Sequence, residues 1–307
     1  MSEFIENEDI IDDKSKNKIE NQWTIAWRRL KKNRLAMMGL VVMIILILIS
    51  LVGPIIYWQS WEATNLINTF AEPSLDHPLG TDQVGRDVLA RVMYGGRISL
   101  SVGVVAVVIQ VAIGTTLGIV AGYYGKGIDA IIMRFVDILM CFPFLPLLIM
   151  LGAVMSSLKI DPKYRMYAVM VVIGIIGWTG LCRLVRGQIL SLREQEFMQA
   201  AEALGLSDLR KMFVHLLPNT LALIIVSATL GVGGAIMTES ALSFLGLGVA
   251  PPIPSWGNMI QAAQDPYALQ FRPWLWVPPG ICIFLTVIAI NLFGDGLRDA
   301  LDPKLKV

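Results

Sequence analysis

Charged residues are scarce in this chain. Only 16% of its 307 residues are Asp, Glu, Lys or Arg, whereas these types make up about a quarter of an ordinary soluble domain. Hydrophobic residues account for 55%, and the mean hydropathy is +0.64. With a net charge of +1, the chain also lacks the basic excess that would attract nucleic acid. The composition excludes a typical soluble domain and indicates a polytopic membrane protein.

Residues that bind metals or carry out covalent chemistry are also few. Cys141, Cys182 and Cys282 lie in apolar segments without C-x-x-C spacing, which predicts buried thiols rather than a disulfide or a metal site. His77 has no second ligand-type residue at useful spacing, so an ordinary position in a loop is the simpler interpretation. The sequence offers no paired carboxylates and no Ser-His-Asp or Cys-His arrangement, and we expect a non-catalytic subunit.

A nucleotide-binding loop is missing as well. Gly125-Lys126-Gly127 resembles part of one, but the P-loop pattern G-x-x-x-x-G-K-[ST] needs Gly at 120 and Ser or Thr at 127. Val120 and Gly127 stand at those positions instead. The segment predicts a flexible turn between two apolar stretches, and we expect no cofactor in this chain.

The N-terminal residues are hydrophilic up to the first apolar segment. Residues 1–22 are acidic and rich in Lys and Asn, a composition typical of a disordered tail. Residues 23–34 predict a short basic amphipathic helix, whose charges orient the chain or, with weaker support, bind a specific lipid. The following apolar segment is too long for a signal peptide, so we expect it to remain as an anchor.

Six apolar segments are long enough to cross a bilayer. A spanning helix needs about 20 residues, and only helices satisfy their own backbone groups in lipid. The sequence therefore predicts an all-α fold with six transmembrane helices, at residues 35–57, 98–122, 130–155, 166–187, 220–245 and 274–295. The predicted organisation is a tail at 1–34, an anchor at 35–57, an extracytoplasmic segment at 58–97, a five-helix core at 98–295 and a C-terminal tail at 296–307.

Lys and Arg predict the orientation, because loops rich in these residues stay in the cytoplasm. An N-terminus inside the cell also places the turn 123–129, the loop 188–219 and the C-terminal end in the cytoplasm, and these segments hold most of the Lys and Arg. Lys159, Lys163 and Arg165 then fall outside, but the opposite orientation would expose the denser cluster before the first span. We expect both termini to be cytoplasmic.

Residues 58–97 form the largest predicted segment outside the membrane. Within it, Gly80-Thr81-Asp82 precedes apolar residues with helical spacing at 84–94. This pattern predicts a capped interfacial helix that leads into the second span.

Ionisable residues inside apolar segments are candidates for function. Glu239, near the outer end of the fifth span, has two interpretations: part of a pathway or gate, or a structural anchor hydrogen-bonded to the following loop. Arg134 and Asp137, three residues apart, are predicted to neutralise each other. Arg183 and Arg186 are predicted to lie in the inner headgroup zone.

Residues 194–217 predict a helix, a sharp turn and a second helix, a unit that we call the knob. Gly205 stands where a left-handed conformation ends the first helix. Ser207 can cap the second, with Asp208 in its first turn, and Pro218 is expected to end it before the fifth span. The apolar stripes of the two helices are Phe197, Ala200, Ala201 and Leu204, then Leu209, Met212, Phe213 and Leu216.

Periodicity alone leaves two interpretations of the knob: an amphipathic loop on the membrane surface, or a docking element for a soluble partner. The identities favour docking, because they resemble the E-A-A-x-x-x-G-x9-I-x-L-P signature of inner-membrane permeases in binding-protein-dependent ABC importers. The matching residues are Ala200, Ala201, Gly205, Leu217 and Pro218. Gln199 replaces the Glu of the signature, and His215 replaces its Ile.

Further segments are similar to the peptide/nickel subfamily of these permeases. They comprise residues 77–87 with 95–100, residues 239–257, and residues 294–303. The resemblance extends from about Arg28 to Lys304 and is strongest to the second, C-type permease of oligopeptide and dipeptide importers.

The resemblance implies a type I ABC importer permease fold in a bacterial or archaeal cytoplasmic membrane. It also implies a second homologous permease as a heterodimer partner, two ATPase subunits that bind ATP and Mg, and an extracytoplasmic substrate-binding protein, with no nucleic acid. Peptides are the expected substrate, and nickel or metallophore complexes are the alternative. The implied ATPase-coupling residues are Gln199, Ala200, Ala201, Glu202, Gly205, Asp208, His215, Leu217 and Pro218.

Two other classes of protein compete with this interpretation. A secondary transporter or channel working alone would call for inward-facing charges near mid-bilayer and an internal repeat, and neither is convincing in the sequence. A membrane scaffold with a docking loop would not need the Pro-rich motif at 251–257 or the C-terminal motif at 294–303.

Overall fold

The computed structural model describes residues 22–302, and helices dominate this part of the chain. In these residues, five helices are long and apolar enough to cross a membrane, and a bent pair supplies a sixth crossing if it counts as one span. The predicted all-α fold is confirmed. The five long helices are α3 (Arg34–Ile56), α4 (Val88–Tyr124), α7 (Pro162–Arg193), α10 (Leu217–Phe244) and α13 (Val277–Leu301).

Shorter elements connect the long helices. The α-helices among them are α2 (Gln22–Lys32), α5 (Lys126–Cys141), α6 (Phe144–Ser157), α8 (Glu196–Ala203), α9 (Asp208–Arg210), α11 (Trp256–Met259) and α12 (Pro266–Phe271). Single 3₁₀ turns form at Leu66–Asn68, Ile260–Gln264 and Pro273–Leu275, and Lys211–Leu216 forms a π-helical turn. Within residues 22–302 the only β pairing is a bridge between Thr81 and Asp87.

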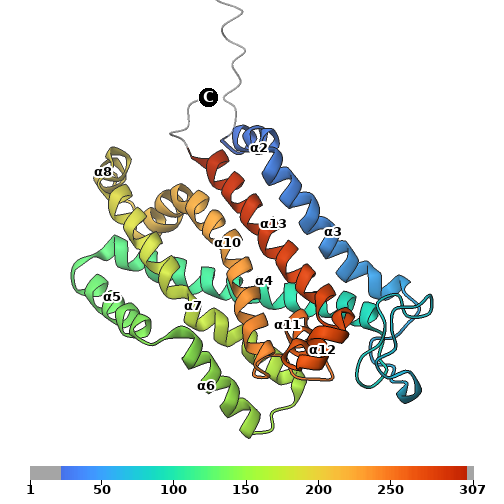
Figure 1. Ribbon diagram of the computed structural model, residues 1–307. Helices are drawn as coiled ribbons and strands as arrows, with labels where there is room; N and C mark the ends of the chain where they lie inside the picture. Colours follow the sequence, from blue (N-terminus) through green and yellow to red (C-terminus); the bar gives the residue numbers. More distant parts are fainter. Residues whose placement is uncertain (1–21, 303–307) are drawn as a thin grey trace, which may run out of the picture.

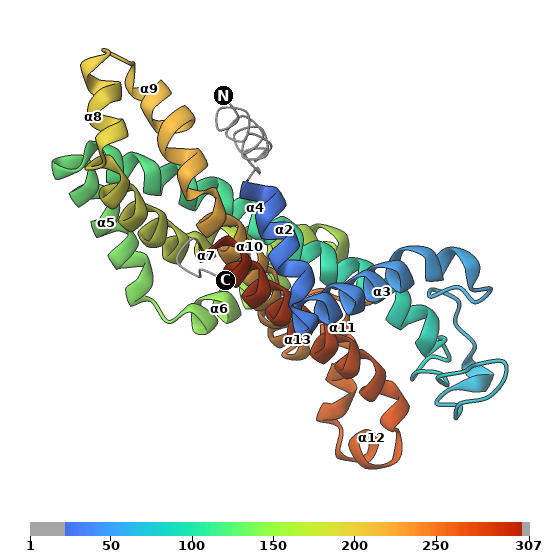
Figure 2. The same ribbon diagram turned by 90° about the horizontal axis from the view of Figure 1, so that it is seen from above.

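The long helices form a bundle with two distinct ends (Figure 1). One end, which we call the knob end, carries α2, α8 and the last turn of α13. The other, the loop end, carries α11, α12 and the segment between α3 and α4. Figure 2 shows α8 and α9 projecting together from the bundle. The disordered tail predicted for residues 1–22 lies, apart from Gln22, outside the described residues.

Helix α4 is longer than the second predicted span. It begins at Val88, where Asp87 caps it by accepting a hydrogen bond from the Ala90 amide at 2.8 Å. The predicted helix does lead into the second span, as the first part of the same helix, but it begins at Val88 with Asp87 as its cap, not at Val84 after Gly80-Thr81-Asp82. Gly96 does not break the helix but admits a neighbour, because an added Cβ would lie 2.1 Å from Ser50 Oγ of α3.

The third predicted span is two helices rather than one. Helices α5 and α6 meet at an angle of 76°. Pro143 has no amide hydrogen and restricts the residue before it, and Phe142 is extended, with φ −78° and ψ 131°. The sequence predicted one span at 130–155 because hydropathy measures only how apolar a segment is. It does not detect a change of direction at a single proline.

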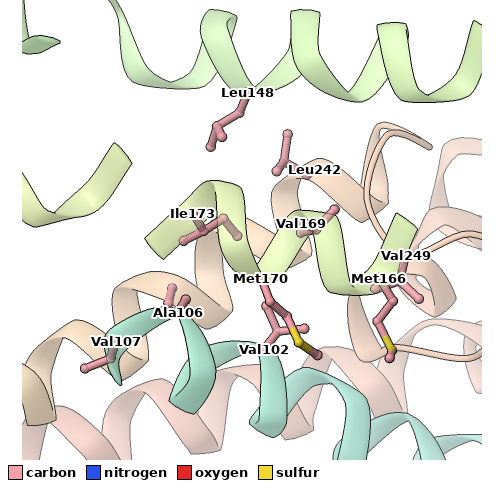
Figure 3. Packing of buried hydrophobic residues seen from close by; sticks show 11 residues of the cluster. Val102, Ala106, Val107, Leu148, Met166, Val169, Met170, Ile173, Leu242 and Val249 are labelled. Atoms are coloured by element: carbon pink, nitrogen blue, oxygen red, sulfur yellow. The ribbon is translucent and has the colours of Figure 1, made fainter. Parts of the chain in front are cut away.

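A buried apolar cluster joins four helices at the centre of the bundle (Figure 3). Val102 and Ala106 of α4 are fully buried, and Ile173 of α7 is 1% exposed. Leu148 of α6 and Leu242 of α10 complete the cluster from the other side. This packing fixes the positions of the helices that carry the knob.

Helix α2 packs on the knob end of α13, so the predicted basic helix is present. Ala26 and Leu30 are buried against Ala300, and Arg29 Nη1 donates to the Asp302 carbonyl at 3.1 Å. Helix α13 continues to Leu301, so the tail predicted from residue 296 begins as helix.

Candidate functional site

The knob has the predicted helix–turn–helix form with one change at its end. Gly205 has a φ of +66°, which confirms the left-handed turn after α8. Ser207 occupies the N-cap position of α9, although its side chain makes no capping hydrogen bond. Pro218 does not end the second helix, because the chain runs from α9 through the π turn into α10. The wider turn before Pro218 accommodates the proline ring, which would clash with a carbonyl of a regular α-turn.

One face of the knob is buried against the bundle. Met198, Met212 and Leu216 are at most 4% exposed. They pack on Ile119 of α4 and Ile189 of α7. The knob is therefore seated on the ends of several long helices.

The opposite face of the knob exposes apolar side chains. We call this surface the apolar cap, and it comprises Phe197 (37% exposed), Leu204 (77%), Leu209 (66%), Phe213 (47%) and Val214 (56%). Each of the two predicted apolar stripes is therefore divided between two faces. Ala201, Met212 and Leu216 face the bundle, and the other residues of the stripes are exposed. An exposed group of large apolar side chains of this kind is typical of an interaction surface.

The other predicted coupling residues surround the apolar cap. Gln199, Ala200 and Glu202 are exposed, and Gln199 Nε2 donates to the Glu194 carbonyl at 3.5 Å. His215 and Leu217 are half-buried, and Pro218 is exposed. The fold brings Glu202 and Asp208 to a shared cavity of about 410 Å³, whereas His215 and Pro218 lie on the π turn and the start of α10.

A polar contact between the knob and α4 was not predicted from the sequence. Tyr123 Oη donates to Asp208 Oδ1 at 2.6 Å, and Lys211 Nζ lies 3.2 Å from the same oxygen. Lys211 is only 9% exposed, and its Nζ lies over the Tyr123 ring, 5.6 Å from the centroid. The only sequence signal was a tyrosine pair at the end of a charge-free span.

Ion pairs join α5 to α7, in place of the predicted pair within α5. Arg186 Nε donates to Asp129 Oδ1 at 2.9 Å, and Arg183 pairs with Asp137. The predicted Arg134–Asp137 neutralisation is therefore wrong. The sequence could not show that helix packing brings Arg183 of α7 to Asp137 of α5.

Glu239 is completely buried where α10 meets α4 and α11. Its carboxylate accepts hydrogen bonds from Ser243 Oγ at 2.6 Å, Ser255 Oγ at 2.9 Å and Ser99 Oγ at 3.3 Å. Each of these hydroxyls also accepts a backbone amide, from Val249, Asn258 and Trp256 respectively. This arrangement supports the anchor interpretation, and a role in a pathway or gate stays a prediction.

A second cavity, of about 360 Å³, opens at the loop end between the residues before α4 and those around α11 and α12. Arg91 is 5% exposed there, with Nη1 donating to the Pro252 carbonyl at 3.3 Å and Nε lying 3.6 Å from Asp82 Oδ2. Asp82 also binds Arg86 Nε at 2.7 Å. These contacts hold the 58–87 segment and the 251–265 segment together.

His77 lies in the loop before α4 and contacts the residue that caps this helix. Its Nδ1 is 2.9 Å from Asp87 Oδ2, which also accepts from Tyr57 Oη at 3.2 Å. Burial, and then the Asp87 carboxylate, raise the pKa of Tyr57 above its ordinary value. The three residues tie the end of α3 to the start of α4.

Among the described residues, no group of three His, Cys, Asp or Glu side chains is arranged so that it could hold a metal ion. The three cysteines are free thiols. Cys182 is buried as predicted, whereas Cys282 is half-buried and Cys141, the last residue of α5 before the break, is exposed.

Comparison with known families assigns the class of this protein. The family model for the inner membrane component of binding-protein-dependent transport systems matches residues 114–307, well over half of the chain. The model for the N-terminal TM domain of oligopeptide transport permease C matches residues 21–73. The chain belongs to the family of binding-protein-dependent transport system inner membrane components, and the resemblance inferred from its motifs is confirmed.

Individual relatives agree with this class over nearly the whole chain. The dipeptide transport system permease protein DppC of Alkalihalophilus pseudofirmus is 44% identical over 92% of this chain and 90% of its own length. The oligopeptide transport system permease protein OppC of Bacillus subtilis is 42% identical over the same shares. That of Haemophilus influenzae is 40% identical over 92% of this chain and 88% of its own length.

Proposed function

We propose that this chain is a permease subunit of an ATP-driven importer that carries peptides across a bacterial or archaeal cytoplasmic membrane. The observation that carries the proposal is the identity of 40% to 44% to permeases named for dipeptide or oligopeptide transport, over about nine-tenths of each chain. These names favour peptides over nickel complexes. The continuous match also favours a subunit of such an importer over a transporter working alone.

The knob is proposed to dock into an ATPase subunit. The apolar cap supports this role, because it offers large apolar side chains, Phe197, Leu204 and Phe213 among them, at the far side of the bundle's buried contact. Closure of two ATPase subunits on ATP and Mg would then pull the knob and bias the bundle between inward-facing and outward-facing states. ATP is bound and hydrolysed by those partners and not by this chain.

Other partners follow from the same proposal. A second homologous permease would complete the pathway, since one chain of five or six spans encloses little space. Exposed apolar residues of the α5–α6 pair, such as Phe135, Phe142 and Met150, support a surface that meets lipid or that second subunit. A substrate-binding protein would deliver the peptide at the loop end, with the knob end and both termini in the cytoplasm.

A substitution at the turn of the knob tests the coupling role. Gly205 has open space around it but a φ of +66°, so valine is opposed by backbone strain alone. In the complete transporter in proteoliposomes, Gly205→Val is expected to lower peptide uptake per ATP hydrolysed at least about 10-fold, whereas Gly205→Asn, which tolerates this conformation, retains most coupling. Normal coupling in the valine variant would contradict the proposal.

A further inference from the structure

The chain itself joins the knob to only two long helices. Helix α7 enters the knob and α10 leaves it, so a pull on the knob reaches both directly. Tyr123, in the last turn of α4, lies 85 residues before Asp208, the knob residue that it contacts. Any force that α4 receives from the knob must pass through side chains.

Tyr123 supplies such a contact at the last turn of α4. Its hydroxyl donates to Asp208 Oδ1 at 2.6 Å, a short bond to an ionised acceptor. Lys211 Nζ lies 3.2 Å from the same carboxylate oxygen and over the Tyr123 ring. Asp208 is at the start of α9 and Lys211 in the π turn, so the contact reaches both halves of the knob's second helix.

A second contact holds the same turn of α4 from the α7 side. Arg193 Nη1 donates to the Tyr123 carbonyl at 2.9 Å, where the end of a helix leaves carbonyl groups without helical partners. Arg193 is also the last residue of α7. The last turn of α4 is thus contacted both by Arg193, at the end of α7, and by Asp208 of the knob.

Helix α4 packs closely against α7 along its length. A Cβ added at Gly114, Gly118 or Gly122 would lie within 3.0 Å of α7 backbone oxygens or side chains. Such small-residue faces bring helix backbones into direct contact. With 37 residues, α4 extends about 55 Å, from the knob to the loop end, where its cap Asp87 meets His77 and Tyr57.

We propose that Tyr123 is a positioning residue that fastens the knob to α4 through Asp208 and Lys211, so that knob movement is transmitted along α4 to the loop end. The inference rests on the proposed coupling role of the knob. Without this bond the knob would still be connected to α7 and α10 and could still dock. Its movement would be transmitted less completely to α4.

The experiment removes one hydroxyl group. Tyr123→Phe keeps the ring under Lys211 and removes the hydroxyl that bonds Asp208 and contacts Lys211. The matched control is Tyr124→Phe, whose ring is 42% exposed and meets Tyr123 edge to face. The complete transporter in proteoliposomes is assayed for peptide uptake and ATP hydrolysis. Tyr123→Phe is expected to lower uptake per ATP about 3- to 10-fold with hydrolysis retained, while the control keeps the wild-type ratio.

A double-mutant cycle distinguishes a specific bond from general disturbance. Asp208→Ala combined with Tyr123→Phe should lower the ratio little further than the stronger single variant, because each substitution alone removes the Tyr123–Asp208 bond. An unchanged ratio in Tyr123→Phe, fully additive losses, or equal losses of uptake and hydrolysis would each overturn the proposal. Gly205→Val in the same assay separates the two hypotheses: if it uncouples while Tyr123→Phe does not, the knob still couples and only the fastening is wrong.

Discussion

Glu239 has a fully buried carboxyl group whose oxygens face serine hydroxyls. Ser99, Ser243 and Ser255 each donate to it while accepting a backbone amide, so the carboxylate organises the backbone of three segments. Burying a polar group costs free energy, and hydrogen bonds of this kind offset that cost. The physical consequence is that α4, α10 and the start of α11 are connected at one point.

Two substitutions of Glu239 should distinguish the contribution of its hydrogen bonds to stability from the contribution of its size. Glu239→Leu leaves the buried hydroxyls without their acceptor and is expected to cost about 2 to 4 kcal/mol, seen as a lower thermal midpoint of the detergent-solubilised transporter. Glu239→Gln keeps an acceptor oxygen and should cost about 1 kcal/mol.

Thr238→Val is the matched control for Glu239, because the Thr238 hydroxyl donates only to Gly234 within α10. It should change the midpoint little. If Glu239→Leu were as stable as this control, the serines would not depend on the carboxylate, and the anchor interpretation would be wrong.

At the scale of the element, α3 is held to α13 by a close backbone approach. A Cβ added at Gly39 would lie 2.6 Å from the Ala289 carbonyl oxygen of α13. Most of α3 is otherwise exposed, with Ile55 and Ile56 at 77% and 76%. The buried side of this first span is therefore narrow and consists of Ala36, Gly39, Leu46 and Ser50.

Gly39→Leu should push α3 away from α13. The expected cost is about 1 to 3 kcal/mol, because the obstacle is backbone rather than a flexible side chain. The measurement is the heat-induced loss of monodisperse chain in detergent. Gly180→Leu, at a position in α7 with open space, is the control and should lose little. Equal stability of the two variants would show that α3 can shift freely.

At the scale of the whole molecule, the bundle has two unlike ends. The knob end carries the apolar cap, and the loop end carries the Arg91–Asp82 contacts around a cavity of about 360 Å³. A chain that joins different partners on two sides of a membrane needs such asymmetry. The proposed orientation assigns the knob end to the cytoplasm.

Cysteine labelling tests that orientation. Leu75, 96% exposed at the loop end, and Leu204, 77% exposed on the knob, are replaced one at a time by cysteine in a variant without the three native cysteines. In intact cells stripped of any outer layer, a membrane-impermeant maleimide should label Leu75→Cys, and should label Leu204→Cys only after lysis. The reverse pattern would invert the topology.

Local sequence signals predicted much of the candidate site. Gly205 was placed in a left-handed turn from its position after an apolar stripe, and its φ of +66° confirms this. The stripes themselves could not reveal which residues would face the bundle. Met198 is buried while Phe197 is exposed, because the ends of α4 and α7, not the knob's own periodicity, determine the buried side.

The sequence by itself determined the membrane class, the helical fold, the approximate spans and the form of the knob, because hydropathy, helical period and turn residues act over short stretches of chain. Only the tertiary structure decided which distant groups meet. Tyr123 with Asp208, Asp137 with Arg183, and Glu239 with Ser99 are each joined across at least 46 residues. Such contacts depend on how helices pack against one another. Short-range patterns in the sequence carry no information about which residues far apart in the chain will meet.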